Sequence, residues 1–162
     1  MPVTLQGSCR CGAVRFSVES HTPHPYQLCY CSICRKAGGS GYAINVMGDR
    51  ATLRVEGAEN IGRFQAPIAE HGGSHLGPCQ RHFCTRCGTM LWVYDDDWPD
   101  LVHPFASAID SDLPEPPERV HMMLDFKPAW VPVAAGPRDK HYGRYCEQSI
   151  EDWHRSRGLW ID

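Results

Sequence analysis

The 162-residue chain lacks the features that mark several large classes of protein. No apolar stretch approaches the roughly 20 residues that cross a bilayer, so we expect no membrane protein. Acidic residues outnumber basic ones by 19 to 16 and neither sign forms a long run. This balance argues against a nucleic-acid partner, which usually requires a strongly basic face. No internal repeat or low-complexity tract is present, and the length fits one domain spanning 1–162.

The beginning of the chain also lacks the basic start and apolar segment of a signal peptide, which predicts a cytoplasmic protein. Against that background, nine cysteines are many. Disulfides are rare in a reducing compartment, so closely spaced cysteines there indicate metal binding.

Short alternating or apolar segments between turn residues predict a protein built mainly of strands. We expect these strands at 13–18, 42–46, 52–56, 61–65, 81–83, 90–94, 101–108 and 120–124. Glycines and prolines predict a turn over 35–41, an irregular loop over 66–80 and no regular structure over 113–118. Ser149, followed three residues later by Asp152, predicts the capped start of a short C-terminal helix.

Seven of the cysteines fall into three closely spaced groups. They are Cys9 and Cys11, then Cys29, Cys31 and Cys34, and finally Cys84 and Cys87. A C-x-x-C turn brings two thiolates to one metal ion while its backbone N–H groups point at the sulfurs. Alternate residues of an extended chain face the same side, so a C-x-C pair can share a metal as well. Gly88, directly after the last group, permits the left-handed backbone that such a turn often needs.

Seven cysteines divide naturally into four and three. A zinc ion held by four cysteines is closed and structural, whereas one held by three keeps a position for water or substrate. The spacing alone leaves open which groups combine. A single C-x-x-C would also fit a redox pair, but three groups in one short chain favour zinc.

Three further residues stand apart from these groups. Cys79 and Cys146 have no close cysteine neighbour, and we interpret both as partly buried free thiols. Cys79 is near enough to Cys84 in the sequence to be a spare ligand candidate. His121 lies in an apolar segment, where a structural role is the better interpretation.

Three motifs and two later segments resemble the glutathione-dependent formaldehyde-activating enzyme family, also called the CENP-V/GFA domain family. The motifs are GSCRCGAV at 7–14, CYCSICRK at 29–36 and RHFCTRCG at 81–88. His121 followed by KPAW at 127–130, and EDW at 151–153, resemble the family's histidine strand and terminal helix. The resemblance covers nearly the whole chain, although 66–80 and 113–118 look individual and could shape a pocket.

The resemblance implies a fold and a pairing of the cysteine groups. The fold is a β-tent of stacked antiparallel sheets around a structural zinc, with a short C-terminal helix. The structural zinc would be bound by Cys9, Cys11, Cys84 and Cys87. A second, catalytic zinc, at full or partial occupancy, would be bound by Cys29, Cys31 and Cys34.

The resemblance also implies an activity, the condensation of glutathione with formaldehyde or a related aldehyde to S-hydroxymethylglutathione, by a carbon–sulfur lyase. Glutathione is then the co-substrate, and the expected partners are a small thiol and an aldehyde. Arg35 and Lys36 follow the last ligand of the second zinc, and we expect them to attract the carboxylates of glutathione. Two alternatives remain at this point. One is a non-catalytic binding module stabilised by zinc, and the other is thiol–disulfide exchange at Cys31 and Cys34.

Overall fold

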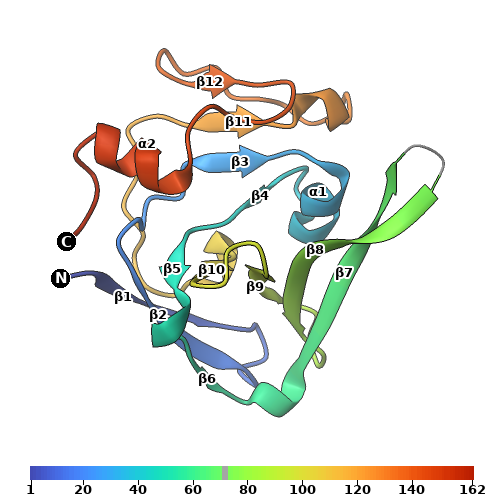
Figure 1. The fold of residues 1–162 in the computed structure, drawn as a ribbon, viewed down its shortest axis with the longest axis vertical. Coiled ribbons are helices and arrows are strands. Elements are labelled where there is room, and N and C mark those ends of the chain that lie inside the picture. The colour runs from blue at the N-terminus through green and yellow to red at the C-terminus, as the bar shows by residue number, and fades with distance from the viewer. Residues whose placement is uncertain (71–72) are drawn as a thin grey trace.

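The computed structural model describes residues 1–70 and 73–162, and these residues form three β-sheets (Figure 1). The first sheet is antiparallel, in the order β1–β2–β6. Its strands are β1 (Val3–Ser8), β2 (Arg15–Ser20) and β6 (Arg54–Glu56). Buried and less buried residues alternate along β2, with Phe16 and Val18 on the buried face. This is the period of two that predicted a strand at 13–18.

The second sheet has five antiparallel strands, in the order β5–β10–β9–β8–β7. The strands are β5 (Gly48–Asp49), β7 (Ile61–Glu70), β8 (Gly73–Cys84), β9 (Met90–Asp95) and β10 (Leu101–Pro104). Trp92 of β9 packs edge-on against Phe16 of the first sheet, with ring centroids 5.2 Å apart. One face of the second sheet therefore forms the main hydrophobic core together with the first sheet.

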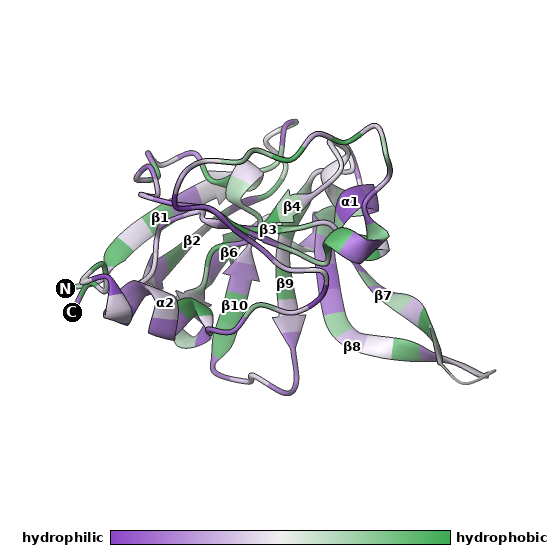
Figure 2. Ribbon diagram, turned by 90° about the horizontal axis from the view of Figure 1, so that it is seen from above, coloured by the Kyte–Doolittle hydropathy of each residue, from purple (hydrophilic) through white to green (hydrophobic). Residues whose placement is uncertain are grey.

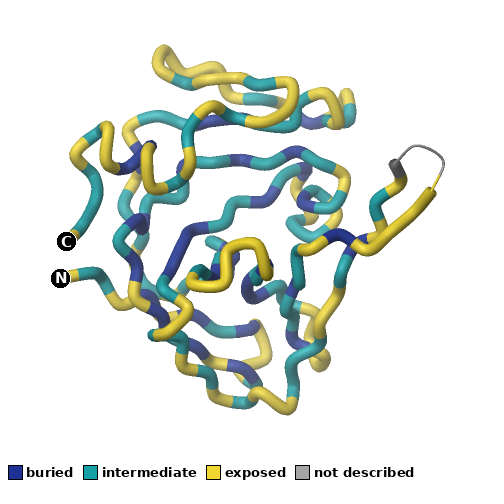
Figure 3. The backbone as a smooth tube through the Cα atoms, viewed as in Figure 1, coloured by how far each residue is buried: buried dark blue, intermediate teal, exposed yellow. Residues whose placement is uncertain are grey.

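The prediction of an irregular loop over 66–80 is wrong. The described part of that range lies in the β7–β8 hairpin, which projects from the side opposite the two termini (Figures 1 and 2). Its pairing register shifts between Gln65 and Pro67, and such a bulge accommodates a proline on an edge strand. Much of the projecting part is exposed (Figure 3). Residues 71 and 72 lie outside the described residues.

The third sheet has the order β12–β11–β3–β4 and mixes strand directions. Its strands are β3 (Gln27–Cys29), β4 (Ala43–Ile44), β11 (Val120–Met122) and β12 (Lys140–His141). β11 runs parallel to both β3 and β12, while β3 and β4 are antiparallel. The predicted mainly β fold with several antiparallel sheets is confirmed, and the two parallel pairings are an addition to it.

The prediction of a turn over 35–41 is wrong in its first half, because α1 (Ser32–Gly38) occupies it. Cys31 caps this helix, since its Sγ accepts a hydrogen bond from the backbone N–H of Cys34 at 3.3 Å. Gly39, in the left-handed conformation, ends it. Single 3₁₀ turns occupy Arg50–Thr52, Ala58–Asn60, Ala106–Ala108 and Leu124–Phe126. Two of these turns shorten predicted strands, because β10 ends at Pro104 and β11 ends at Met122.

The second helix, α2 (Ile150–Ser156), confirms the predicted C-terminal helix. The hydroxyl of Ser149 accepts a hydrogen bond from the backbone N–H of Asp152 at 3.0 Å, as expected of an N-cap. Trp153 is buried and stacks on Tyr26, which precedes β3, with ring centroids 3.6 Å apart. The helix thereby packs against the start of β3, an inner strand of the third sheet. Neither helix in the described parts of the chain has the length and apolar character to cross a membrane.

Docking of α2 should depend on pH because His154, beside Trp153, is fully buried. Its Nδ1 bonds to the carbonyl of Ile150, and its Nε2 accepts a hydrogen bond from the backbone N–H of His24. Burial lowers the pKa of His154 from 6.5 to about 4. The unfolded chain therefore binds a proton more readily than the folded chain, and stability present above pH 6.5 falls as the pH approaches 4.

We expect the free energy of unfolding to decrease by on the order of 3 kcal/mol over this range, at about 1.4 kcal/mol per pH unit. Denaturant titrations between pH 7 and 4 measure the decrease. The variant His154→Gln, which keeps a donor and an acceptor but no titrating ring, should show a shallower decrease, whereas His75→Gln on the exposed hairpin should not. An equal slope in all three proteins would contradict the assignment to His154.

Candidate metal centres and the adjoining cavity

The first cysteine group joins two distant parts of the chain. Cys9 and Cys11 lie in the turn between β1 and β2, Cys84 ends β8 and Cys87 follows it. Their four Sγ atoms lie within 4.8 Å of one another. The Cys9–Cys11 and Cys11–Cys84 sulfur distances are 3.5 Å and 3.8 Å. Tetrahedral zinc–sulfur bonds of about 2.3 Å place sulfurs about 3.8 Å apart, so the donor set fits such an ion.

The backbone holds these sulfurs in place through two tight turns. The N–H of Val14 donates to Cys9 Sγ at 3.2 Å, and the N–H of Gly88 donates to the carbonyl of Cys84 at 2.8 Å. Gly88 has a φ of 76°, as predicted for the residue after the second cysteine. Hydrogen bonds with Thr89 lower the pKa of exposed Cys87 to about 5. A thiolate, the form that binds metal, is thus favoured there.

The second cysteine group surrounds the start of α1. Cys29 ends β3, Cys31 caps the helix and Cys34 lies in its first turn, and their Sγ atoms are also within 4.8 Å of one another. Hydrogen bonds from Cys29 and Cys34 lower the pKa of Cys31 to about 2, whereas the hydrogen bonds of Cys29 with Cys31 and Cys34 raise the pKa of Cys29. Both groups can hold a metal ion, and the second offers three ligands.

Tyr30, between two of these cysteines, faces away from them and anchors the segment. Its hydroxyl lies 2.8 Å from Nδ1 of His121, and Nε2 of His121 lies 3.4 Å from an Asp139 carboxylate oxygen. Tyr30 and His121 are fully buried. These contacts agree with the structural interpretation of His121.

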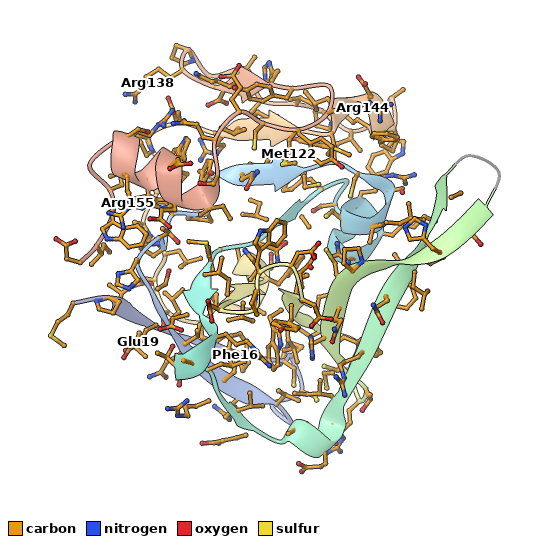
Figure 4. All side chains as sticks on the ribbon, in the orientation of Figure 1. Phe16, Glu19, Met122, Arg138, Arg144 and Arg155 are labelled. Carbon is orange, nitrogen blue, oxygen red and sulfur yellow. The ribbon has the colours of Figure 1, made fainter. Side chains whose placement is uncertain are left out.

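A cavity of about 430 Å³ opens beside the second group, with Cys29 in its wall. Alternate residues of the second sheet face it, because residues of one parity share one face of a strand. They are Cys79 and Arg81 of β8, Val93 and Asp95 of β9, and Leu101 and His103 of β10. The opposite wall includes Met122 of β11, which Figure 4 labels on the third sheet. The cavity therefore lies between the second and third sheets, on the face of the second sheet opposite Trp92.

The segment before α2 completes the cavity. Tyr145, Cys146 and Gln148 line it. The side-chain amide of Gln27 on β3 donates to Cys146 Sγ at 3.0 Å and to Met122 Sδ at 2.9 Å. Cys146 is a free, half-buried thiol, as expected.

The remaining predicted site residues lie elsewhere or have other partners. Cys79 belongs to neither cysteine group. It donates to an Asp95 carboxylate oxygen at 3.2 Å, and burial together with Asp95 raises its pKa to about 12. Lys36 is exposed and lines a second cavity between α1 and the hairpin, and Arg35 is half-buried on the same helix. Neither lines the cavity beside Cys29, so their contact with glutathione stays a prediction.

Sequence reasoning missed the two buried charged residues of the first cavity. Arg81 donates from Nη2 to Cys34 Sγ at 3.5 Å, and Asp95 accepts hydrogen bonds from Cys79 Sγ and from the backbone N–H of Asp97. Both are more than nine-tenths buried. The available signal was the spacing of two between Arg81 and Cys79, which places both side chains on one face of a strand.

A family model described as "Glutathione-dependent formaldehyde-activating enzyme" matches residues 4–123, which include both cysteine groups. The chain belongs to this family. A relative from Halomonas elongata, provisionally named as a glutathione-dependent formaldehyde-activating enzyme, is 56% identical over 156 residues, covering 96% of this chain and 97% of that protein. A crystal structure of a Rhodobacter sphaeroides protein matches with a TM-score of 0.53 and 27% identity, over 67% of this chain and 91% of that chain.

The C-x-x-C-G turn at 84–88 gives a test of the first cysteine group. At Gly88 an added Cβ would meet no atom within 4 Å, so only the left-handed backbone disfavours a side chain there. We expect Gly88→Ala to lower the free energy of unfolding by about 1–2 kcal/mol. Gly88→Asn should cost less, because asparagine tolerates this conformation. Equal losses for both variants in denaturant titrations would show that backbone strain is not the cause.

Proposed function

We propose that this protein is a zinc-dependent carbon–sulfur lyase-type enzyme that condenses glutathione with formaldehyde, or a related aldehyde, to S-hydroxymethylglutathione. One observation carries the proposal, namely that a group of three cysteines lies beside a cavity large enough for a small thiol and an aldehyde, with Cys29 in the cavity wall. Membership of the family and the name of the Halomonas elongata relative support it. We also propose that 1–162 forms one zinc domain acting in the cytoplasm.

The four-cysteine group is the proposed structural site. Cys9, Cys11, Cys84 and Cys87 would fill all four positions of a tetrahedral zinc, leaving none for substrate. The turn between β1 and β2 would then be joined to the end of β8 through a contact that spans 73 positions, from Cys11 to Cys84.

The three-cysteine group is the proposed reactive site. Cys29, Cys31 and Cys34 would hold the zinc, which would supply Lewis-acid chemistry when bound. In the reaction the thiol sulfur forms a bond to the carbonyl carbon, the π electron pair moves to oxygen, and oxygen takes up the proton that the thiol loses. The mostly apolar cavity wall excludes water from the two reactants, and Cys29 places the cysteine group at that wall.

Arg35 and Lys36 are proposed to attract glutathione at a distance. Both lie on α1, immediately after Cys34, without lining the cavity beside Cys29. Their charges would raise the local concentration of an anionic tripeptide near the cavity.

The alternative is a non-catalytic binding module that zinc stabilises. The projecting hairpin favours it, because Phe64 and Leu76 are 51% and 63% exposed there. Apolar side chains so exposed are suited to a protein contact. The two functions differ in whether glutathione at millimolar concentration raises the melting temperature, as it should only if it binds the folded protein.

Metal analysis tests the reactive site. We expect two zinc ions per chain in the wild type and one in Cys29→Ser, with at least about a hundredfold loss of condensation rate, since the loss of a ligand removes the Lewis acid. Cys146→Ser, which changes a free thiol, should keep both zinc ions. One zinc per chain in the wild type, with Cys29, Cys31 and Cys34 freely alkylated in the native protein, would rule out the two-zinc proposal.

Removal of both zinc ions tests the structural site. We expect the chelated protein to lose its cooperative thermal transition in circular dichroism. Without zinc, no ion would bind the four cysteines, and they would no longer hold the first two sheets together. Re-addition of zinc should restore the transition. The structural assignment fails if the zinc-free protein melts cooperatively at the same temperature as the zinc-bound protein.

A further inference from the structure

A buried cation without a carboxylate partner lies beside the second cysteine group. Arg81 is 7% exposed, and it is not part of any ion pair formed by residues 1–70 and 73–162. Its Nη2 donates to Cys34 Sγ at 3.5 Å. Its Nη1 is buried as well and has no hydrogen-bond partner among the described residues.

Such an arrangement is unfavourable unless an anion offsets it, because an unpaired charge loses its hydration on burial. Asp95 faces the same cavity but already accepts hydrogen bonds from Cys79 and Asp97. In the strand register, Arg81 is opposite Val93, whereas Asp95 is opposite Cys79. Asp95 therefore faces the same side of the sheet as Arg81 but lies two residues further along β9 than the residue opposite Arg81. The sulfur of Cys34 is therefore the hydrogen-bond acceptor of Arg81, together with whatever enters the two cavities that Arg81 lines.

Building on the proposed function, we propose that Arg81 is a substrate-binding residue that holds the sulfur of the thiol substrate, as its thiolate, beside Cys34.

The contacts of Arg81 favour a sulfur over a carboxylate. A guanidinium binds a carboxylate best through two parallel N–H donors, and Nη2 of Arg81 is already directed at Cys34 Sγ. Nη1, whose N–H groups have no partner among the described residues, can donate to an acceptor atom next to that sulfur. Guanidinium is weakly hydrated, which suits it to a large, soft anion in an apolar wall.

Calorimetric titration of the zinc-loaded protein tests this assignment. The ligands are glutathione, S-methylglutathione, which keeps the carboxylates but blocks the sulfur, and 2-mercaptoethanol, which has a thiol but no carboxylate. The proteins are the wild type, Arg81→Met, Arg81→Lys and the control Arg63→Met on the exposed part of neighbouring β7, compared at equal zinc content.

We expect Arg81→Met to raise the Kd of both thiols by about 10- to 100-fold, the range for a hydrogen bond to a charged group, and to leave S-methylglutathione binding unchanged. The Kd of both thiols for Arg81→Lys should lie between the values for the wild type and Arg81→Met. Lysine keeps the positive charge but lacks the planar set of N–H donors of a guanidinium. Arg63→Met should match the wild type. The melting temperature of ligand-free Arg81→Met should fall by no more than the loss of one hydrogen bond to Cys34 explains, since methionine is apolar and of similar size and Nη1 has no partner to lose.

Three results would overturn the assignment. If Arg81→Met binds both thiols with the same Kd as the wild type, Arg81 has no binding role. If its melting temperature is also lowered, Arg81 has a structural role. Equal weakening of glutathione and S-methylglutathione, with 2-mercaptoethanol unchanged, would make Arg81 a carboxylate-binding residue. A wild type that binds neither thiol would refute the proposed function and this assignment together. Binding of 2-mercaptoethanol without glutathione, weakened in Arg81→Met, would refute the proposed function while supporting Arg81.

Discussion

The convergence of four cysteine sulfurs is the contact on which the arrangement of the sheets depends. Cys9 and Cys84 are buried members of the main core, so the group is continuous with the apolar packing between the first two sheets. Four thiols this close cannot all ionise without a cation among them. The same sulfurs therefore fix the end of β8 beside the turn between β1 and β2, and they do so only when a cation or bound protons offset their charge.

The position of β8 in turn determines the cavity. Cys84 is the last residue of the strand, and Cys79 and Arg81 precede it, two residues apart on one face. On the other side, Tyr30 places Cys29 and Cys31 through its buried contact with His121. Each wall of the cavity thus contains a strand that ends in a cysteine of one group, and the contact between Arg81 and Cys34 connects β8 with the second group.

Much of the candidate site could be predicted from the sequence, because cysteine spacing reports local geometry directly. The C-x-x-C-G turn predicted a left-handed backbone at Gly88, and Ser149 predicted the start of a helix. Both predictions were possible because each feature depends on only a few adjacent residues. The hairpin and α1 could not be predicted in the same way. Pro67 is tolerated only because β7 is an edge strand with a bulge, and α1 begins only because a cysteine side chain serves as its cap. The contact of Arg81 with Cys34 depends on how segments far apart in the sequence pack together, and no local sequence pattern reveals that packing.

The segment around Tyr145–Gln148 has a consequence for how this family diversifies. The family match ends at residue 123, whereas part of the cavity wall is contributed by residues more than twenty positions further on. The cysteines that would perform the chemistry and the residues that close the cavity over it are therefore encoded in separate stretches of chain. A change in the later stretch can alter which molecules fit without disturbing the metal ligands. Relatives that keep the same seven cysteines can on this basis share a reaction and still differ in the molecules that undergo it.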